Sequence, residues 1–294
     1  MTEIASEPNP KDPYPPQGVD LSRPSVARVY DWYLGGTANW AIDRAFGQQV
    51  LDRFPLLRPI AIANRLYLHR VVRYLAKRGI RQFLDIGSGV PTMGHVHAVA
   101  DEITTDSHVV YVDYEPVAVA HSKILLEKNG DPSRHAAIQG DLRDPDKLWD
   151  RVAETGVIDV EQPLALLLIA VLHVAQPGPE GEDVGPASVA RFRQLMVPGS
   201  YLAVSHITDD GVAPELDQKL IDLKRMYDSS SSSNGIWRSQ AEIRELFGDF
   251  ELIDPGMTWI TEWHPEETGP NAPVIEFASP NESVGFCGVG RKRS

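Results

Sequence analysis

Cysteine is nearly absent from this chain, which has a single cysteine, Cys287, among its 294 residues. One cysteine can form neither an internal disulfide nor a zinc site built from several thiolates. Long apolar runs are absent too, because no stretch approaches the roughly 20 residues that a membrane helix needs. The N-terminus lacks the basic and apolar regions of a signal peptide. These absences fit a reducing compartment, and we expect a cytoplasmic protein without membrane contact.

Positive charge is scarce as well: 28 lysines and arginines stand against 41 aspartates and glutamates, a formal net charge of −13. Nucleic-acid-binding proteins usually carry a basic patch, because neutralising phosphates supplies much of their affinity. We therefore expect no nucleic-acid partner. Hydrophobic residues make up 42% of the chain, which is ordinary for a globular protein with a large core. The composition does not predict an oligomeric state.

Three segments of different character follow one another along the chain. Residues 1–20 hold prolines at positions 8, 10, 13, 15 and 16 and little that can pack, so we expect a disordered leader. Residues 21–79 place apolar residues at helical spacing and predict an N-terminal helical cap, with helices over 23–34, 40–54 and 57–77. Residues 80–294 predict a cofactor-binding domain of another architecture.

Apolar runs alternate with helical patterns in this second part. We expect strands over residues 82–86, 108–112, 135–139, 163–172 and 200–207, separated by helices over 92–101, 116–129, 145–153 and 185–195. A helix over 213–227, a serine loop over 229–233, a helix over 239–247 and strands over 250–253 and 283–290 follow. This alternation predicts an α/β fold, with a mainly parallel sheet covered by helices on both faces.

A glycine-rich turn carries the strongest local signal, in the sequence FLDIGSGVPTMG over residues 83–94. Gly87, Ser88 and Gly89 follow a buried strand, and glycine lets the backbone pass close to a ligand. A dinucleotide-binding turn would place a third glycine where Thr92 stands, and we expect Thr92 to be the N-cap of the next helix instead. Asp85 precedes the turn, where its negative charge suits the cationic amino group of S-adenosylmethionine.

Acidic residues also follow the second and third predicted strands. Asp113 is the best candidate to accept both ribose hydroxyls, with Glu115 as the alternative and Tyr114 between them as a further cofactor contact. Asp141 stands where its carboxylate could accept the adenine amino group, while Leu142 would offer its backbone N–H. The alternative for Asp141 is a turn, or the N-cap of the following helix.

The three blocks together resemble class I S-adenosylmethionine-dependent methyltransferases, which have a Rossmann-like fold. More narrowly, the chain from about residue 21 resembles a bacterial, actinobacterial-type methyltransferase family of unassigned substrate. The resemblance rests on RVYDWYLGG (28–36), NRLYL (64–68), FLDIGSGVPT (83–92), VVYVD (109–113), GDLR (140–143) and VPGSYL (197–202).

This resemblance implies a seven-stranded sheet of strand order 3-2-1-4-5-7-6, with the seventh strand antiparallel. It also implies which residues contact the cofactor. These are Asp85, Gly87, Gly89, Asp113, Asp141 and Leu142, with Ala170 and Val171 lining the cleft at the end of the fourth strand.

Polar residues interrupt the apolar faces of the N-terminal helices. We expect Tyr30 and Arg65 to face the cofactor, with the Arg65 guanidinium paired to the methionine carboxylate. The alternative is that Arg28 and Arg65 tie the helices together through ion pairs with Asp31 or Asp43.

Methyl transfer needs a general base only when the acceptor must lose a proton. His173, directly after the fourth strand, is the candidate base, and His206 is a weaker one. The alternative is that His173 is a hydrogen-bonded structural residue. The tail of the fourth strand is Ala-Val-Leu-His, not the Asn/Asp-Pro-Pro-Tyr/Phe motif of adenine and glutamine amino-group methylases.

No metal site is expected. His95 and His97 stand two residues apart on a predicted surface helix, so their rings should point to different faces. Three tryptophans in the C-terminal part either wall an acceptor pocket or pack in the core: Trp237, Trp259 and Trp263.

We therefore predict a methyltransferase that moves a methyl group from S-adenosylmethionine to a small-molecule nucleophile. Two rival functions stay open. One is a non-catalytic protein that senses the cofactor or serves as a scaffold, and the other is an NAD-dependent Rossmann oxidoreductase, which the missing third glycine disfavours.

Overall fold

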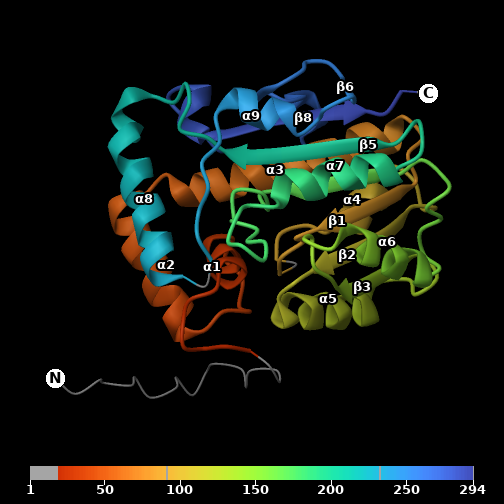
Figure 1. Ribbon diagram of the computed structural model, residues 1–294, viewed down its shortest axis with the longest axis horizontal. Coiled ribbons are helices and arrows are strands. Elements are labelled where there is room, and N and C mark those ends of the chain that lie inside the picture. The colour runs from red at the N-terminus through yellow and green to blue at the C-terminus, as the bar shows by residue number, and fades with distance from the viewer. Residues whose placement is uncertain (1–18, 91, 232, 294) are drawn as a thin grey trace.

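A twisted, mainly parallel β-sheet forms the centre of the computed structural model, which describes residues 19–90, 92–231 and 233–293 (Figure 1). The strand order is β3-β2-β1-β4-β5-β8-β6, and β8 runs antiparallel to both of its neighbours. The bounds are β1 Gln82–Ile86, β2 His108–Asp113, β3 His135–Gln139, β4 Ala165–Ile169, β5 Tyr201–Ile207, β6 Glu251–Leu252 and β8 Gly285–Arg291. The predicted strand order is thus confirmed, with β8 as the antiparallel seventh strand.

The segment 255–281, for which no strand was predicted, contains an eighth, short strand, β7 (Thr258–Trp259). This strand pairs with β8. Two residues are too few to produce a periodic pattern, so this strand exists only because β8 offers it a pairing edge. The same segment also contains the short 3₁₀ helix η2 (Pro265–Glu267), and a second one, η3 (Pro280–Ser283), begins at its end.

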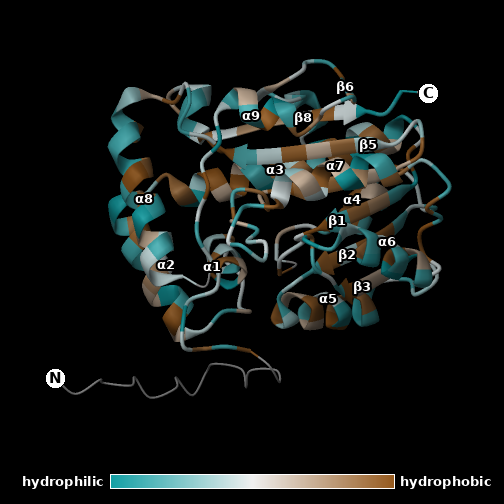
Figure 2. Cartoon of the chain, in the orientation of Figure 1, coloured by the Kyte–Doolittle hydropathy of each residue, from teal (hydrophilic) through white to brown (hydrophobic). Residues whose placement is uncertain are grey.

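Helices cover both faces of the sheet. On one face, α3 (Leu57–Lys77), α4 (Val96–Asp101) and α5 (Pro116–Asn129) surround a core that includes Phe83 and Val109. On the other face, α6 (Pro145–Glu154), α7 (Gly185–Leu195) and the residues after α9 (Gln240–Glu245) pack against Leu84 and Val110. Neighbouring strand residues thus enter opposite cores, and Figure 2 shows the strands mostly brown beneath helices that alternate brown and teal.

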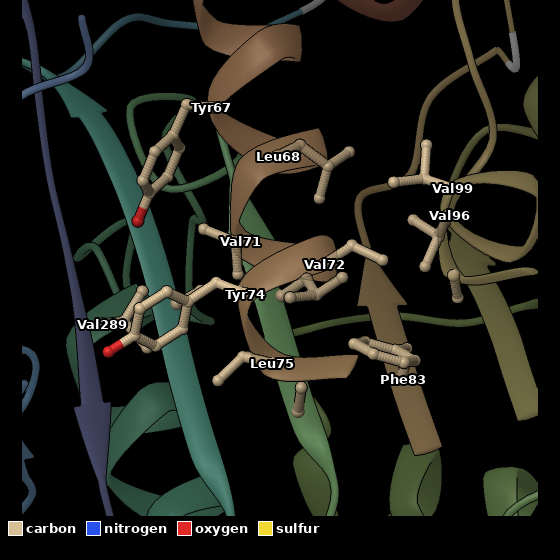
Figure 3. Close-up of a cluster of buried hydrophobic side chains, with 14 of the residues drawn as sticks. Tyr67, Leu68, Val71, Val72, Tyr74, Leu75, Phe83, Val96, Val99 and Val289 are labelled. Atoms are coloured by element: carbon tan, nitrogen blue, oxygen red, sulfur yellow. The ribbon is translucent and has the colours of Figure 1, made fainter. Parts of the chain in front are cut away.

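The long helix α3 crosses the sheet, and its predicted bounds are confirmed at both ends. Its apolar stripe buries Leu68 and Val72 on the side that faces Phe83 of β1 (Figure 3). The Tyr67 hydroxyl donates a hydrogen bond to the Gly288 carbonyl at 2.8 Å, so α3 is also fastened to β8. No helix in the described part of the chain has the length and apolar character needed to cross a membrane.

A separate group of helices stands at the edge where β5 ends (Figure 1). It consists of α1 (Val26–Tyr33), α2 (Ala41–Arg53), η1 (Pro214–Leu216) and α8 (Asp217–Ser230), which share a third core that includes Val29 and Leu220. We call this group the helical wall. The division of the chain at residue 79, between a helical cap and the cofactor-binding domain, stays a prediction, and most of the proposed leader lies outside the described residues.

The first two residues of the serine run, Ser229 and Ser230, depart from the predicted loop conformation. Helix α8 continues through Ser230, and Ser231 is its C-cap. The Ser229 hydroxyl donates to the Met226 carbonyl at 3.2 Å and the Ser231 hydroxyl to the Tyr227 carbonyl at 2.8 Å. These bonds to the preceding turn let serine continue a helix that composition alone does not predict.

Candidate functional site

The central crevice of the sheet lies where β1 and β4 are neighbours and the strand order reverses. In such α/β sheets, ligands bind outside the carboxyl ends of the strands at this switch point. Asp85 pairs in register with Tyr111 of β2 and with Leu167 of β4. The glycine turn after β1, the acidic end of β2 and the end of β4 therefore meet at one edge of the sheet.

The glycine turn is held by the end of β2. The amides of Gly87 and Ser88 both donate to the Val112 carbonyl, at 2.8 and 3.1 Å. Gly87 and Gly89 have φ values of 72° and 65°, which other residues rarely adopt. A Cβ at Gly87 would lie 2.5 Å from Cγ2 of Val171, whereas one at Gly89 would meet nothing within 4 Å. Gly87 therefore makes room for Val171, and Gly89 borders open space.

Asp85 is buried beside this turn, and its Oδ2 has no hydrogen-bond partner in the described structure. Burial raises the pKa of Asp85 to about 6; the Arg65 guanidinium acts in the opposite direction, and the Asp113 carboxylate adds a smaller increase. An unpaired buried carboxylate oxygen is costly. A cationic amino group bound here would remove that cost, so the site fits the methionine end of S-adenosylmethionine.

Asp113 is fixed by two backbone amides. Its Oδ2 accepts from the Gly89 amide and its Oδ1 from the Glu115 amide, each at 2.8 Å. Burial raises the pKa of Asp113 to about 6, although these hydrogen bonds oppose the rise. Each carboxylate oxygen keeps a second lone pair for a hydroxyl. The Glu115 carboxylate lies 3.9 Å from Nη1 of Arg28, which makes Glu115 the less available of the two candidates.

Asp141 is largely engaged by its own neighbour. Its carboxylate accepts the Arg143 amide at 2.9 Å and forms an ion pair with Nη2 of Arg143 at 2.7 Å. The turn predicted for Asp141 is thus confirmed, whereas the alternative role as helix N-cap is wrong, because Asp144 caps α6. Hydrogen bonds from Arg143 lower the pKa of Asp141. The Leu142 side chain is buried in the core, which leaves its backbone for a ligand.

Tyr114 is exposed between these two acidic ends, with 62% of its surface open. The Arg143 guanidinium carbon lies 5.3 Å from the centre of its ring. The aromatic face at this position is therefore available to stack on a planar group, and Arg143 connects it to Asp141.

Arg65 binds the loop that follows the glycine turn. Its Nε donates to the Met93 carbonyl at 2.8 Å and its Nη2 to the Gly94 carbonyl at 2.5 Å. The predicted ion pair of Arg65 with Asp31 or Asp43 is therefore wrong. The corresponding prediction for Arg28 is confirmed, since its Nε lies 2.8 Å from Oδ2 of Asp43.

The loop after the glycine turn is longer than predicted. Helix α4 begins at Val96 with His95 as its N-cap, so the assignment of Thr92 as N-cap is wrong. The Thr92 hydroxyl instead donates to Oδ1 of the buried Asp31 on α1. Gly94 interrupts the chain with a φ of 60°, which is incompatible with helix continuation. The loop is thereby tied to the helical wall.

His95 and His97 are stacked, with ring centres 5.5 Å apart and planes 13° from parallel. The prediction that they point to different faces of a surface helix is wrong, because His95 is the extended residue before the helix. His97 is buried, with its Nδ1 2.8 Å from the Tyr111 hydroxyl. No group of three metal-ligating side chains occurs among the described residues.

A cavity lies between the end of the sheet and the helical wall, with about 740 Å³ of empty space that is partly open to solvent. The side chains and backbone that line it come from eight separate stretches of the chain. They are Val26, Tyr30, Tyr33, Leu57, Ile60, Ala61, Asn64, Ala170, His173, Val174, Ser205, His206, Ile207, Leu223, Tyr227, Ser233, Asn234, Gly235, Trp237, Ile260 and Gly285. We call it the wall cavity. Ala170, predicted to line the cofactor cleft, belongs to it.

A chain of hydrogen bonds joins the helices to the sheet along this cavity. The Tyr30 hydroxyl accepts from Nδ2 of Asn64 at 3.1 Å and donates to the Ala61 carbonyl at 3.0 Å. Oδ1 of Asn64 accepts from the Ser205 hydroxyl, whose oxygen accepts the Ala170 amide at 3.0 Å. Ala170 has a φ of 59°, a strained conformation of the kind found at functional sites.

The two candidate bases differ in their surroundings. Both ring nitrogens of His206 are engaged, Nε2 with Nη1 of Arg238 and Nδ1 with the Ile207 carbonyl, each at 2.6 Å. His173 lines the cavity, and its Nδ1 is buried without a hydrogen-bond partner in the described structure. Burial and, to a lesser degree, the Arg238 guanidinium lower the pKa of His173 to about 4, so its ring is neutral at pH 7. Of the two histidines, His173 is therefore the one with a ring nitrogen free to accept a proton.

Arg238 is an important residue that sequence reasoning missed. It donates to the Leu172 carbonyl at 2.6 Å and pairs with Asp183, besides holding His206. A single arginine between a serine run and a short helix carries no motif, so no local signal could have singled it out.

The three tryptophans divide between the two predicted alternatives. Trp237 lines the cavity, 6.4 Å from the His173 ring between centres. Trp263 is fully buried in the core beneath α3, and Trp259 packs on Phe286 at 5.5 Å between ring centres.

The fold and the crevice together define a class I methyltransferase architecture. The chain belongs to the S-adenosyl methyltransferase family, whose sequence model matches residues 13–293. The protein is therefore an S-adenosylmethionine-dependent methyltransferase, and no comparison favours a nicotinamide oxidoreductase or a non-catalytic binding protein.

Two solved structures are similar along nearly the whole chain. A provisionally assigned methyltransferase from Thermobifida fusca is 37% identical, with a TM-score of 0.81, over 96% of this chain and 99% of the other. A DUF574 family protein from Streptomyces avermitilis is 32% identical, with a TM-score of 0.79, over 92% and 98%. An O-methyltransferase family protein from Burkholderia thailandensis, 13% identical with a TM-score of 0.50 over 81% and 60%, shares the fold. No curated protein sequence matches the chain.

Proposed function

We propose that this enzyme methylates a small-molecule nucleophile bound in the wall cavity, next to S-adenosylmethionine in the crevice. The observation that carries the proposal is the position of the end of β4: Ala170 lines the cavity, while Val171 packs over Gly87 of the glycine turn. Two ligands bound on either side of this segment would be neighbours, as alignment of nucleophile and methyl group requires.

The crevice residues divide the cofactor among them. Asp85 takes the amino group, and Nη1 of Arg65, which neither of its two carbonyl bonds uses, takes the methionine carboxylate. Asp113 accepts the ribose hydroxyls, while Ser88 and the two turn glycines let the backbone approach. Around the adenine, the Tyr114 ring stacks on the base and the Leu142 backbone N–H donates a hydrogen bond. The Asp141 carboxylate accepts a hydrogen bond with the lone pairs that its ion pair with Arg143 leaves free.

S-adenosylmethionine supplies an electrophilic methyl group: the acceptor's lone pair bonds to the methyl carbon, the carbon–sulfur pair returns to sulfur, and S-adenosylhomocysteine remains. The protein's part is to exclude water and to hold the acceptor in line. For a hydroxyl acceptor, Nδ1 of His173 accepts the departing proton, since its ring is neutral at pH 7 and this nitrogen is unpaired. A cytoplasmic location, expected from the sequence, stays part of this proposal.

Calorimetric titration with S-adenosylmethionine, S-adenosylhomocysteine and NAD tests the cofactor half of the proposal. We expect both sulfur ligands to bind and NAD not to bind. Binding of NAD alone would overturn the proposal. The protein could also bind the sulfur ligands but transfer no methyl group to any small molecule in a broad acceptor screen. That outcome would support the alternative of a non-catalytic binding protein.

A further inference from the structure

The wall cavity differs from the chain as a whole in the residues that line it. None of its described lining residues is Asp, Glu, Lys or Arg, although the whole chain has 69 of them, 28 basic and 41 acidic. A charged ligand group would lose its hydration here without gaining a partner of opposite charge.

Most polar groups around the cavity already bond one another. Tyr30, Asn64 and Ser205 form the chain described above, and the hydroxyls of Tyr33 and Tyr227 lie 3.3 Å apart. Burial raises the pKa of Tyr227 to about 12 and moves that of Tyr33 upward as well, so both phenols stay neutral. A ligand therefore finds few free hydrogen-bonding groups.

Among the buried side-chain atoms of the described lining, Nδ1 of His173 has no hydrogen-bond partner. Leaving such a nitrogen unpaired costs free energy, and a hydroxyl or N–H donor from a ligand would recover it. The centre of the Trp237 ring lies 6.4 Å from that of the His173 ring. The Tyr227 ring packs edge-on against Phe46, with 5.1 Å between the ring centres. Rigid aromatic walls of this kind favour offset or edge contacts with a planar ligand.

We propose that the methyl acceptor is a neutral aromatic molecule with a hydrogen-bond donor, a hydroxyl or ring N–H, that pairs with His173. This inference rests on the proposed function, because it names the substrate class of the same site. It excludes carboxylates, phosphates and protonated amines as the portion of the acceptor that enters the cavity.

The test compares three naphthalenes that share one ring system and differ in charge at pH 7: neutral 2-naphthol, anionic naphthalene-2-carboxylate and cationic 2-naphthylmethylammonium. Each is titrated calorimetrically into the protein, with and without saturating S-adenosylhomocysteine. We expect 2-naphthol to bind about tenfold or more tightly than either ion. Equal or tighter binding of an ion, or no binding of any probe by protein that binds S-adenosylhomocysteine, overturns the inference and leaves the proposed function standing. Failure of S-adenosylhomocysteine to bind counts against the proposed function instead.

A charge placed in the cavity wall provides the matched variant. Val174→Glu adds a carboxylate to a lining residue, whereas Ile221→Glu adds one to an apolar residue of α8 that is 43% exposed and outside the lining. We expect Val174→Glu to weaken 2-naphthol and to strengthen the cationic probe, and Ile221→Glu to change neither. Unchanged S-adenosylhomocysteine affinity shows that Val174→Glu is folded; if it is not, the three-probe comparison on the unaltered protein still decides.

Discussion

The crevice and the wall cavity lie on either side of one strand end, yet the crevice is acidic and the described lining of the cavity is uncharged. The crevice buries the carboxyl groups of Asp85 and Asp113, and each has its pKa raised to about 6 by that burial. The cavity is lined by no charged side chain among the described residues. This contrast indicates that the two ligands differ in charge. The crevice suits a polar ligand with a cationic amino group, and the cavity suits a neutral ligand.

The largest expected effect concerns the cavity side. His173→Ala should slow methyl transfer to a neutral aromatic acceptor by about 100- to 10,000-fold, because the acceptor's proton loses its base. Affinity for S-adenosylhomocysteine should stay nearly unchanged. Transfer rates with labelled S-adenosylmethionine and calorimetry measure the two quantities. His121→Ala on α5, outside the cavity lining, is the control, and normal turnover of the His173 variant would make His173 a structural residue.

The next largest effect concerns the crevice side. Gly87→Ala should destabilise the protein by about 2–4 kcal/mol, since it combines a positive φ with a clash against Val171. It should also weaken S-adenosylhomocysteine binding. Gly156→Ala is the matched control, because Gly156 has a φ of 67° but a Cβ there meets nothing within 4 Å. Equal denaturant stability of the two variants would refute the role of the close packing against Val171.

A smaller effect separates the two candidate ribose ligands. Asp113→Ala should weaken S-adenosylhomocysteine binding by about 1–3 kcal/mol, because it removes acceptors for the ribose hydroxyls. Glu115→Gln should have little effect on affinity, since Glu115 faces Arg28. Calorimetry on both variants decides the assignment. If affinity survives in the Asp113 variant and falls in the other, Glu115 is the ribose ligand.

The smallest expected effect is on how the stability of the protein depends on pH, which differs between the two regions. The folded-state pKa of Asp85 is raised to about 6, so its contribution to stability is complete below about pH 3.8 and is lost as pH rises through 6. The folded-state pKa of His173 is lowered to about 4, so its contribution is complete above about pH 6.5 and is lost as pH falls through 4.

Denaturant unfolding between pH 4 and 6.5 measures these opposite contributions. In Asp85→Asn the free energy of unfolding should rise more steeply with pH than in the unaltered protein, and in His173→Gln less steeply. The slopes should change by at most about 1.4 kcal/mol per pH unit. Slope changes of the same sign in both variants would contradict the contrast between crevice and cavity.

Local sequence patterns predicted the scaffold well. The bounds of α3 follow from one apolar stripe with its breaks, and the strands follow from buried apolar runs, because each signal is contained in a few consecutive residues. The glycine turn was found for the same reason. The strand order came from the family resemblance, and the Gly94 break that moves the start of α4 to Val96 was overlooked.

The amino-acid sequence was enough to predict the α/β fold, the family and a cofactor crevice built from contiguous motifs. Other features became visible only in the folded chain: the wall cavity, the pairing of Thr92 with Asp31, the stacking of His95 on His97 and the role of Arg238. The physical reason is distance along the chain: a motif records the backbone needs of its own few residues. The cavity's neutrality, by contrast, emerges when residues from Val26 to Gly285 are brought together by packing.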